Sequence, residues 1–242
     1  MSVTLQLNNL HKRFGGLVAV KDVSFTLSPG EVVGLLGPNG SGKTTVMNMI
    51  SGALPCDGGR VTVGAKDITR MKPHRVAKHG VARTFQLVRP LPTLTVGENV
   101  MLSLAFGHKR YWGRQARDLA EEKLAFVGLE GRGDEEVSNL NYIDQKRMEM
   151  ARALASEPEI LLLDEWLAGL NPSELKIGID LVRHLQGQGM TVLLVEHIME
   201  AVRALCSRCI VMRTGEVIAD GPSEEVLSQP AVIKAYLGDD HA

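Results

Sequence analysis

The sequence is poor in cysteine, and this scarcity excludes one class of protein. Its three cysteines, Cys56, Cys206 and Cys209, are an odd and sparse set, so they predict no disulfide framework and a reducing compartment. Cys206 and Cys209 form a C-x-x-C pair, but a zinc site needs more ligands than the sequence places beside them. We therefore expect two small packing residues where a helix passes into a strand.

An excess of charge and a long apolar run are also missing. The chain has 27 basic and 28 acidic residues, which predicts a mixed, solvated surface and no nucleic-acid partner. Its longest apolar runs, such as ILLL and MTVLLV, are far shorter than the roughly 20 residues that span a bilayer, and no secretory signal opens the chain. We expect the protein not to cross a membrane by itself, although an integral partner can hold it there.

The sequence predicts strands near its N-terminus, helices in the middle, and alternating strands and helices toward its C-terminus. The stretches VTLQLNNL and KDVSFTLSPGEVVGLLG predict strands, the first of them an edge strand with one wet face. Residues 87–158 carry prolines and amphipathic helical patterns, and from EILLLDE onward strands and helices alternate. We therefore predict an α/β core, residues 1–86 and 159–242, with an inserted helical subdomain, residues 87–158.

A glycine-rich loop connects a predicted buried strand to a predicted helix. The stretch GPNGSGKTT fits G-x-x-x-x-G-K-[ST]. Glycines let the backbone turn its N–H groups toward phosphate, the lysine adds positive charge near the β- and γ-phosphates, and the threonine hydroxyl ligates Mg²⁺. We expect a nucleoside triphosphate with Mg²⁺, held by Gly37, Asn39, Gly40, Ser41, Gly42, Lys43, Thr44 and Thr45.

Two carboxylates end the predicted strand ILLLDE. Ligands of open α/β sheets bind at the carboxyl ends of the strands, so we expect Asp164 to hold Mg²⁺ and Glu165 to act as general base on an attacking water. A small-molecule kinase shares the phosphate loop and stays open as an alternative here. Its basic lid would be HKRYWGRQAR, a stretch that fits the solvated face of a helix better.

Taken together, the motifs resemble those of the ATP-binding subunits of ABC transporters over essentially the whole chain. Phe14 follows the first strand in KRFGG, ARTFQ resembles the Q-loop with Gln86, and LNYIDQKRMEMARAL stands where the signature motif belongs. ILLLDE, the D-loop stretch AGLNP and the switch histidine of LLVEH, His197, follow in the family's order. The resemblance implies a P-loop NTPase core of ABC type, with a mostly parallel sheet, an N-terminal antiparallel β part and the inserted helical subdomain.

The resemblance also assigns roles that the residues alone do not. Phe14 would stack on adenine, Gln86 would ligate and sense Mg²⁺ near the attacking water, and His197 would contact the γ-phosphate beside Glu165. Two subunits would close head to tail around two ATP molecules, each held between the phosphate loop of one subunit and the signature of the other. The expected activity is ATP hydrolysis coupled to transport.

Three further stretches, KRFGGLVAV, LNYIDQKR and PAVIKAYLG, are most similar to the ATPases of branched-chain amino-acid importers. This similarity implies integral permease subunits, a second ATP-binding subunit, a periplasmic or extracellular substrate-binding protein, and a peripheral, cytoplasmic place on the inner face of the cell membrane. The alternatives are import of urea or amides, lipopolysaccharide export, a weakly hydrolysing dimerisation switch, and a soluble ABC ATPase of repair or translation.

Two positions depart from the family pattern. The signature reads Asn141, Tyr142, Ile143 and Asp144; Asn141 suits a helix cap, but Ile143 stands where a glycine is expected and would add bulk where a phosphate approaches. Trp166 replaces a proline and is expected to add apolar surface near the dimer interface. Because a signature serves the partner's ATP, we predict an asymmetric heterodimer in which the partner's ATP is hydrolysed poorly.

Overall fold

Two sheets form the framework of the protein, whose computed structural model describes residues 3–84, 88–107 and 109–237. In the described part of the chain, the smaller sheet has the strand order β2-β1-β4-β5 and is antiparallel, and the larger has the order β10-β9-β3-β8-β7-β6 and is parallel except for β10. The strands are β1 (Leu5–Phe14), β2 (Leu17–Leu27), β3 (Val32–Leu36), β4 (Gly58–Val63), β5 (Lys66–Asp67), β6 (Val81–Arg83), β7 (Ile160–Asp164), β8 (Thr191–Val195), β9 (Arg208–Arg213) and β10 (Glu216–Pro222).

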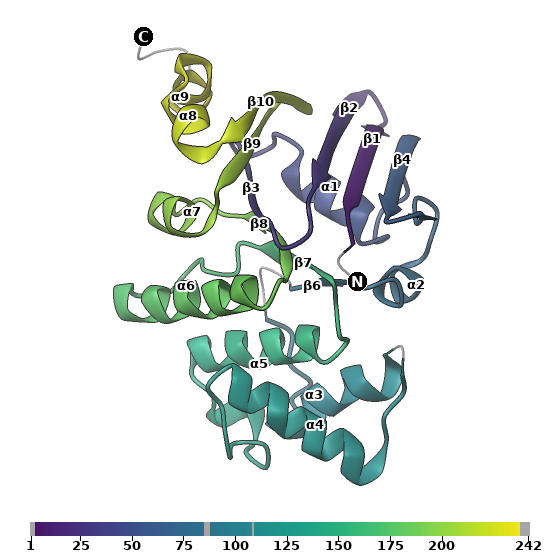
Figure 1. Ribbon diagram of the computed structural model, residues 1–242, viewed down its shortest axis with the longest axis vertical. Coiled ribbons are helices and arrows are strands. Elements are labelled where there is room, and N and C mark those ends of the chain that lie inside the picture. Colours follow the sequence, from purple (N-terminus) through teal and green to yellow (C-terminus); the bar gives the residue numbers. More distant parts are fainter. Residues whose placement is uncertain (1–2, 85–87, 108, 238–242) are drawn as a thin grey trace.

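The helices gather in separate groups around these sheets. Figure 1 shows α3, α4 and α5 together at one end of the molecule, and α1 with the smaller sheet at the other. The helices are α1 (Lys43–Ile50), α2 (Pro73–Ala77), α3 (Val96–Phe106), α4 (Gly113–Phe126), α5 (Tyr142–Leu154), α6 (Pro172–Gly187), α7 (Met199–Leu205), α8 (Ser223–Ser228) and α9 (Pro230–Leu237), with a 3₁₀ turn at Val137–Asn139. The expected α/β architecture, with an antiparallel β part near the N-terminus, is confirmed.

Alternate residues of the central strands enter two different cores. In β7, Leu161 and Leu163 join a cluster that includes residues of α3 to α7, whereas Ile160 and Leu162 join a cluster with α1 and the smaller sheet. Because both faces of the sheet are covered, its strands are continuously apolar instead of alternating. This burial is the physical reason that ILLL and TVLLV predict strands of a parallel sheet.

The first strand corrects one expectation. β1 pairs with both β2 and β4, so it is an inner strand of its sheet and not an edge strand. Its alternation of buried and exposed residues arises from one solvated face, and an inner strand of an antiparallel sheet shows the same pattern. The short helix α2 was not predicted.

The predicted helices lie between β6 and β7. Thr95 caps α3 in a capping box with Glu98. Among the described helices, none is both long enough and apolar enough to span a bilayer. The division of the chain at residues 87 and 158 stays a prediction.

The C-x-x-C pair lies where α7 passes into β9, as expected. A Cβ atom on Gly34 would lie 3.2 Å from the sulfur of Cys206 and 3.3 Å from that of Cys209, so the two thiols fill the space that this glycine leaves. The Ser223 hydroxyl donates to the carbonyl oxygen of Cys206 at 2.6 Å and lies 3.1 Å from the sulfur of Cys209. Burial raises the pKa of both thiols, which keeps them protonated and unreactive.

We expect one thiol to react with a disulfide reagent in the native protein and three to react after denaturation. Cys56 is half-buried, whereas Cys206 and Cys209 are buried and their pKa values are raised, so Cys56 reacts first. Thiol titration with and without denaturant measures this difference. Cys56→Ser is the control, because it should abolish the native reaction; rapid reaction of two thiols in the native protein would contradict the packing described above.

Candidate active site

Three neighbouring parallel strands end at the candidate site. β3 leads into the glycine-rich loop and α1, β7 ends at Asp164 with Glu165 next, and His197 follows β8. Because β8 lies between β3 and β7, the carboxyl ends of all three strands meet at one edge of the sheet. The topology therefore brings together the loop, the carboxylates and the histidine that the sequence predicted.

Two glycines give the phosphate loop a shape that other residues do not fit. Gly37 has a φ of +142°, and a Cβ atom there would clash with the carbonyl oxygen of Met212. Gly42 has a φ of +103° and precedes α1, and its Cβ would clash with the carbonyl oxygen of Ala19. The first turn of α1 has N–H groups without helical partners, which is the arrangement that binds phosphate.

The other loop residues offer groups to a nucleotide. Asn39, Gly40 and Thr44 are exposed, and Thr45 is half-buried. The hydroxyl of Ser41 is buried and makes no hydrogen bond to a described residue. A buried hydroxyl without a partner is unfavourable, so a phosphate oxygen at this position would satisfy it.

The Lys43 ammonium lies inside the loop. It donates to the carbonyl oxygens of Gly37 at 2.7 Å and Pro38 at 3.0 Å. Burial lowers the pKa of Lys43, and the charges of Glu165 and Asp164 oppose this effect. The ammonium thus lies in the field of both carboxylates, at the place where the motif predicts the β- and γ-phosphates.

Asp164 has a buried cationic partner that sequence reasoning missed. The Arg83 guanidinium, at the end of β6, lies 2.6 Å from Asp164 Oδ2 and also donates to Asn48 Oδ1 at 2.7 Å and Ser51 Oγ at 3.2 Å. Both side chains of the ion pair are largely buried, so each compensates the desolvation of the other. The only sequence signal was the position of Arg83 in ARTFQ, just before Gln86.

The residues present fit a magnesium ion. Asp164 Oδ1 and the Thr44 hydroxyl make no hydrogen bond within the described part of the chain, so these hard oxygen ligands can accept a cation. The third predicted ligand, Gln86, lies outside the described residues. Among the described residues, no group of three or more His, Cys, Asp or Glu side chains is arranged to hold a metal ion.

Glu165 and His197 face one another. The Nε2 atom of His197 lies 3.2 Å from Oε1 of Glu165, and both side chains are partly exposed. Glu165 has a φ of +50°, a left-handed conformation that is uncommon for a residue with a side chain. Its N–H donates to the carbonyl oxygen of Val195 at 2.8 Å, which fixes the carboxylate close to the end of β8.

Trp166 is buried, contrary to the expectation of apolar surface near an interface. Its indole packs against Gly178, where a Cβ atom would lie 3.3 Å from the ring. The indole N–H donates to the carbonyl oxygen of Lys146 at 3.2 Å. Trp166, the residue after Glu165, therefore belongs to the core and is hydrogen-bonded to α5.

The four signature residues divide into two exposed and two buried ones. Asn141 caps α5 by accepting from the N–H of Asp144 at 2.9 Å, as predicted, and Tyr142 is also exposed. Ile143 is only 5% exposed. Asp144 is buried and pairs with Arg132 at 2.7 Å and Arg147 at 3.1 Å. The side chain of Ile143 thus packs inward, so it does not add the predicted bulk at the surface that a partner's phosphate would approach.

Two further residues lie where they can contact the adenine or the phosphate loop. Phe14 is 48% exposed at the end of β1, so its ring is accessible to a ligand and is not part of the core. The Tyr236 hydroxyl, in α9, accepts a hydrogen bond from the N–H of Gly37 at 2.8 Å, and burial raises the pKa of this tyrosine. This contact joins residues far apart in the sequence and had no signal apart from the stretch PAVIKAYLG.

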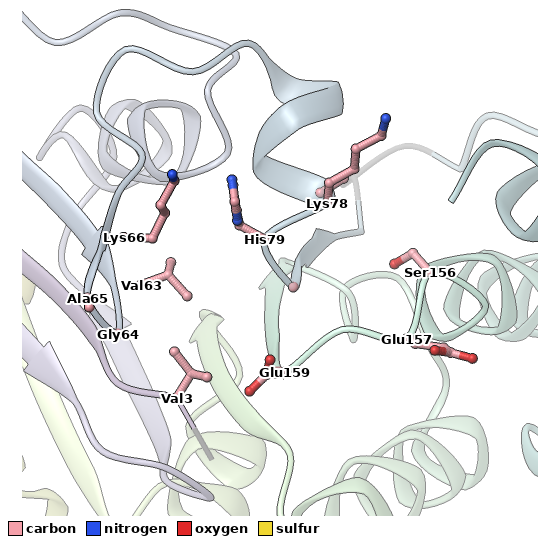
Figure 2. A pocket seen from close by; sticks show the side chains of 12 residues that line it. Val3, Val63, Gly64, Ala65, Lys66, Lys78, His79, Ser156, Glu157 and Glu159 are labelled. Carbon is pink, nitrogen blue, oxygen red and sulfur yellow. The ribbon is translucent and has the colours of Figure 1, made fainter. Parts of the chain in front are cut away.

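A pocket of about 500 Å³ lies away from these residues. Figure 2 shows that Lys66 and Lys78 line it together with His79, Glu157 and Glu159. Glu159 precedes β7 and Gly80 precedes β6, so this pocket lies at the amino ends of the parallel strands, opposite the phosphate loop. It holds none of the residues that the sequence assigned to the nucleotide.

The comparison with known families decides between the candidate activities. The family model described as "ABC transporter" matches residues 20–168, and the one described as "Branched-chain amino acid ATP-binding cassette transporter" matches residues 216–242. This chain belongs to the ABC transporter family. The small-molecule kinase is thereby set aside, and the protein is an ATP-binding, ATP-hydrolysing transporter subunit.

Related proteins and solved structures match this ABC ATPase over most of its length. It is 39% identical to the high-affinity branched-chain amino acid transport ATP-binding protein LivG of Salmonella typhimurium, covering 97% of this chain and 98% of that protein. It is 35% identical to the lipopolysaccharide export ATP-binding protein LptB of Escherichia coli, covering 98% of both. A nucleotide-free ATP-binding cassette matches with a TM-score of 0.87 at 32% identity over 98% and 100% of the two chains, and an ADP-bound dimeric cassette matches with 0.80 at 28% over 90% and 98%.

We expect Ile143→Gly to lower the free energy of unfolding of this ABC ATPase by roughly 3 kcal/mol. The change empties a buried side-chain position and places glycine in α5. Urea denaturation measures the loss, and Ile143→Val, which removes one methyl group, should cost only about 1 kcal/mol. A glycine variant as stable as the wild type would show instead that Ile143 lies at the surface.

Proposed function

We propose that this ATPase drives import of branched-chain or related amino acids through a membrane permease. The relatives at 39% identity are named for branched-chain amino-acid transport, and the matched C-terminal residues carry the same description. LptB, an export ATPase, is less similar at 35% identity. The contact of Glu165 with His197, beside a complete phosphate loop, is the observation that supports hydrolysis as its driving reaction.

The residue roles follow from where the chain places each group. ATP lies with its phosphates on the loop and the first turn of α1, with Lys43 beside the γ-phosphate and the adenine on the exposed ring of Phe14. Thr44 and Asp164 hold Mg²⁺, together with Gln86. When bound, this ion neutralises charge on the β- and γ-phosphates.

Glu165 accepts a proton from the attacking water. Its carboxylate lies within 3.2 Å of His197, so a water near both groups and the γ-phosphate can be oriented for attack in line with the leaving oxygen. His197 fixes the carboxylate and contacts the γ-phosphate. Hydrolysis then weakens the contacts that hold the phosphate between two subunits.

A second ATP-binding subunit completes each site. The exposed Asn141 and Tyr142, at the N-terminus of α5, are the signature groups that face the partner's nucleotide. Because Ile143 packs inward, the steric argument for a strongly asymmetric heterodimer loses its support. The match to a dimeric cassette favours a pair, either of two copies or of two related chains.

The permease docks where the inserted helices α3 to α5 adjoin the α/β core. A groove of about 500 Å³ is lined by the end of α1, by β6 and by α5, with Arg89, Ser103 and Arg152 among its residues. Arg89 and Ser103 belong to residues 87–106, and by the resemblance to ABC ATPases this segment would receive a coupling helix from the permease. We therefore place the chain at the cytoplasmic face of the membrane, with a substrate-binding protein on the opposite side.

Glu165→Gln is expected to lower ATP turnover by about 10²- to 10⁴-fold, because it removes the general base. ATP affinity should change little, since the phosphate loop makes the main contacts. Phosphate release by the assembled transporter and binding of a fluorescent ATP analogue measure the two quantities. Glu224→Gln, an exposed change on α8, is the control. Unchanged turnover in Glu165→Gln would sink the proposed role of Glu165.

Membrane vesicles with the chain and ATP on the inside, the permeases in the membrane and the binding protein outside should accumulate labelled leucine. Lys43→Ala should abolish this uptake, because it removes the ammonium from the phosphate loop. Labelled urea and short amides serve as competing substrates in the same vesicles. Uptake of urea without uptake of leucine would replace the proposed substrate class.

A further inference from the structure

The peptide group between Trp166 and Leu167 is held at both of its polar atoms. The Lys146 ammonium, from α5, donates to the carbonyl oxygen of Trp166 at 2.8 Å. The Glu196 carboxylate, directly after β8, accepts from the N–H of Leu167 at 2.7 Å. Lys146 is 0% exposed and Glu196 is 1% exposed, so both bonds form away from solvent.

The two side chains compensate one another through this peptide. A single buried charge is strongly unfavourable unless it is paired or well hydrogen-bonded. Here a cation binds the negative end of the peptide dipole and an anion binds the positive end, which is the favourable orientation of both charges. The ammonium also lies 4.9 Å from the centre of the Tyr142 ring, which adds a cation–π contact.

The held peptide lies one residue beyond Glu165, whose backbone is in a left-handed conformation with a φ of +50°. Such a conformation persists only where its surroundings fix it. The N–H of Glu165 is held by the carbonyl oxygen of Val195, and the peptide between Trp166 and Leu167 is held by Lys146 and Glu196. The backbone is thus fixed on both sides of the residue whose carboxylate lies 3.2 Å from His197.

We propose that Lys146 and Glu196 form a peptide clamp that positions Glu165 for catalysis and ties it to the signature helix α5 of the same chain. The inference rests on the proposed role of Glu165 as general base. Lys146 and Glu196 are positioning residues, because neither contacts the nucleotide groups directly. Through α5, a movement of Asn141 and Tyr142 against a partner's ATP reaches the clamp and hence this chain's own carboxylate.

Glu196 also gives the clamp a dependence on pH. Burial raises the pKa of Glu196 to about 7, the N–H groups of Leu167 and His197 and the charge of Lys146 oppose this shift, and the charge of Glu165 adds to it. Cys206 is the other titratable group that faces Glu196, and its raised pKa keeps it neutral. Above about pH 7 the ionised carboxylate is the stronger acceptor for Leu167, so the clamp is tighter.

Ionisation of Glu196 tightens the clamp but lowers the stability of the folded protein. Between the ordinary pKa of a glutamate, about 4.3, and the folded value of about 7, the folded protein keeps a proton that the unfolded chain releases. The contribution of Glu196 to stability therefore falls as the pH rises through this range. The ionised clamp orients Glu165 at a cost in folding stability.

The test compares Glu196→Gln, Lys146→Met and the double variant in the assembled transporter. Glu196→Gln keeps an acceptor for Leu167 but does not titrate, so the ratio of wild-type to variant turnover should rise as the pH increases through about 7. Lys146→Met should lower kcat by about tenfold to 10²-fold through misplacement of Glu165. The double variant should lose less than the product of the two single losses, because both residues hold one peptide.

Two measurements separate positioning from general instability. ATP affinity should stay within about twofold of the wild type in each variant, because the clamp does not contact the phosphate loop. The melting temperature of Glu196→Gln should exceed that of the wild type above pH 7, and the difference should narrow toward pH 5. The controls are Lys176→Met and Glu224→Gln, which replace exposed residues of the same types.

The outcomes distinguish the clamp from the proposed function. If Glu165→Gln abolishes turnover but Glu196→Gln shows the wild-type dependence of both kcat and melting temperature on pH, the clamp is wrong and the function stands. If Glu165→Gln leaves turnover unchanged, the proposed role of Glu165 as general base fails, and the clamp loses the residue that it would position. Should Lys146→Met not fold, the isosteric Glu196→Gln decides alone.

Discussion

The parallel pairing of β8 with β3 on one side and β7 on the other is the constraint on which the site depends. In this register Asp164 pairs with Val195, and Val33 with Leu193. A slip of one residue in either pair would turn every side chain of the strand to the opposite face of the sheet. Glu165 and His197 would then no longer meet above the phosphate loop. The apolar packing on both faces of these strands therefore fixes the chemistry as well as the fold.

The motifs that could be predicted from the sequence are local ones. A phosphate loop needs a short run of residue types between a strand and a helix, and the buried strands show continuous apolar runs, so neither requires knowledge of distant contacts. The partners that sequence reasoning missed, such as Arg83, Lys146 and Glu196, act on groups that are remote in the chain. Their roles depend on which strands and helices become neighbours, and a single sequence does not contain that information.

The two departures from the family pattern illustrate the same limit. A β-branched residue in place of glycine and an indole in place of proline both look disruptive when only their types are known. In the structure Ile143 and Trp166 are both buried, and the indole of Trp166 packs against Gly178 of α6. What decides their effect is the direction of each side chain, which differs between adjacent positions of one helical turn or loop. Tyr142 and Ile143 are neighbours with opposite exposure.

The place of β3 in the larger sheet has a consequence for the order of assembly. Val33 pairs with Leu193 on one side and with Arg208 on the other, so the strand that carries the phosphate loop is completed by residues synthesised long after it. Contacts so remote in sequence form slowly, because a long stretch of chain must be brought together first. The helices α3 to α5 rely on closer neighbours and can form early. Nucleotide binding is thus a late product of folding, and ATP reports on the assembly of nearly the whole chain.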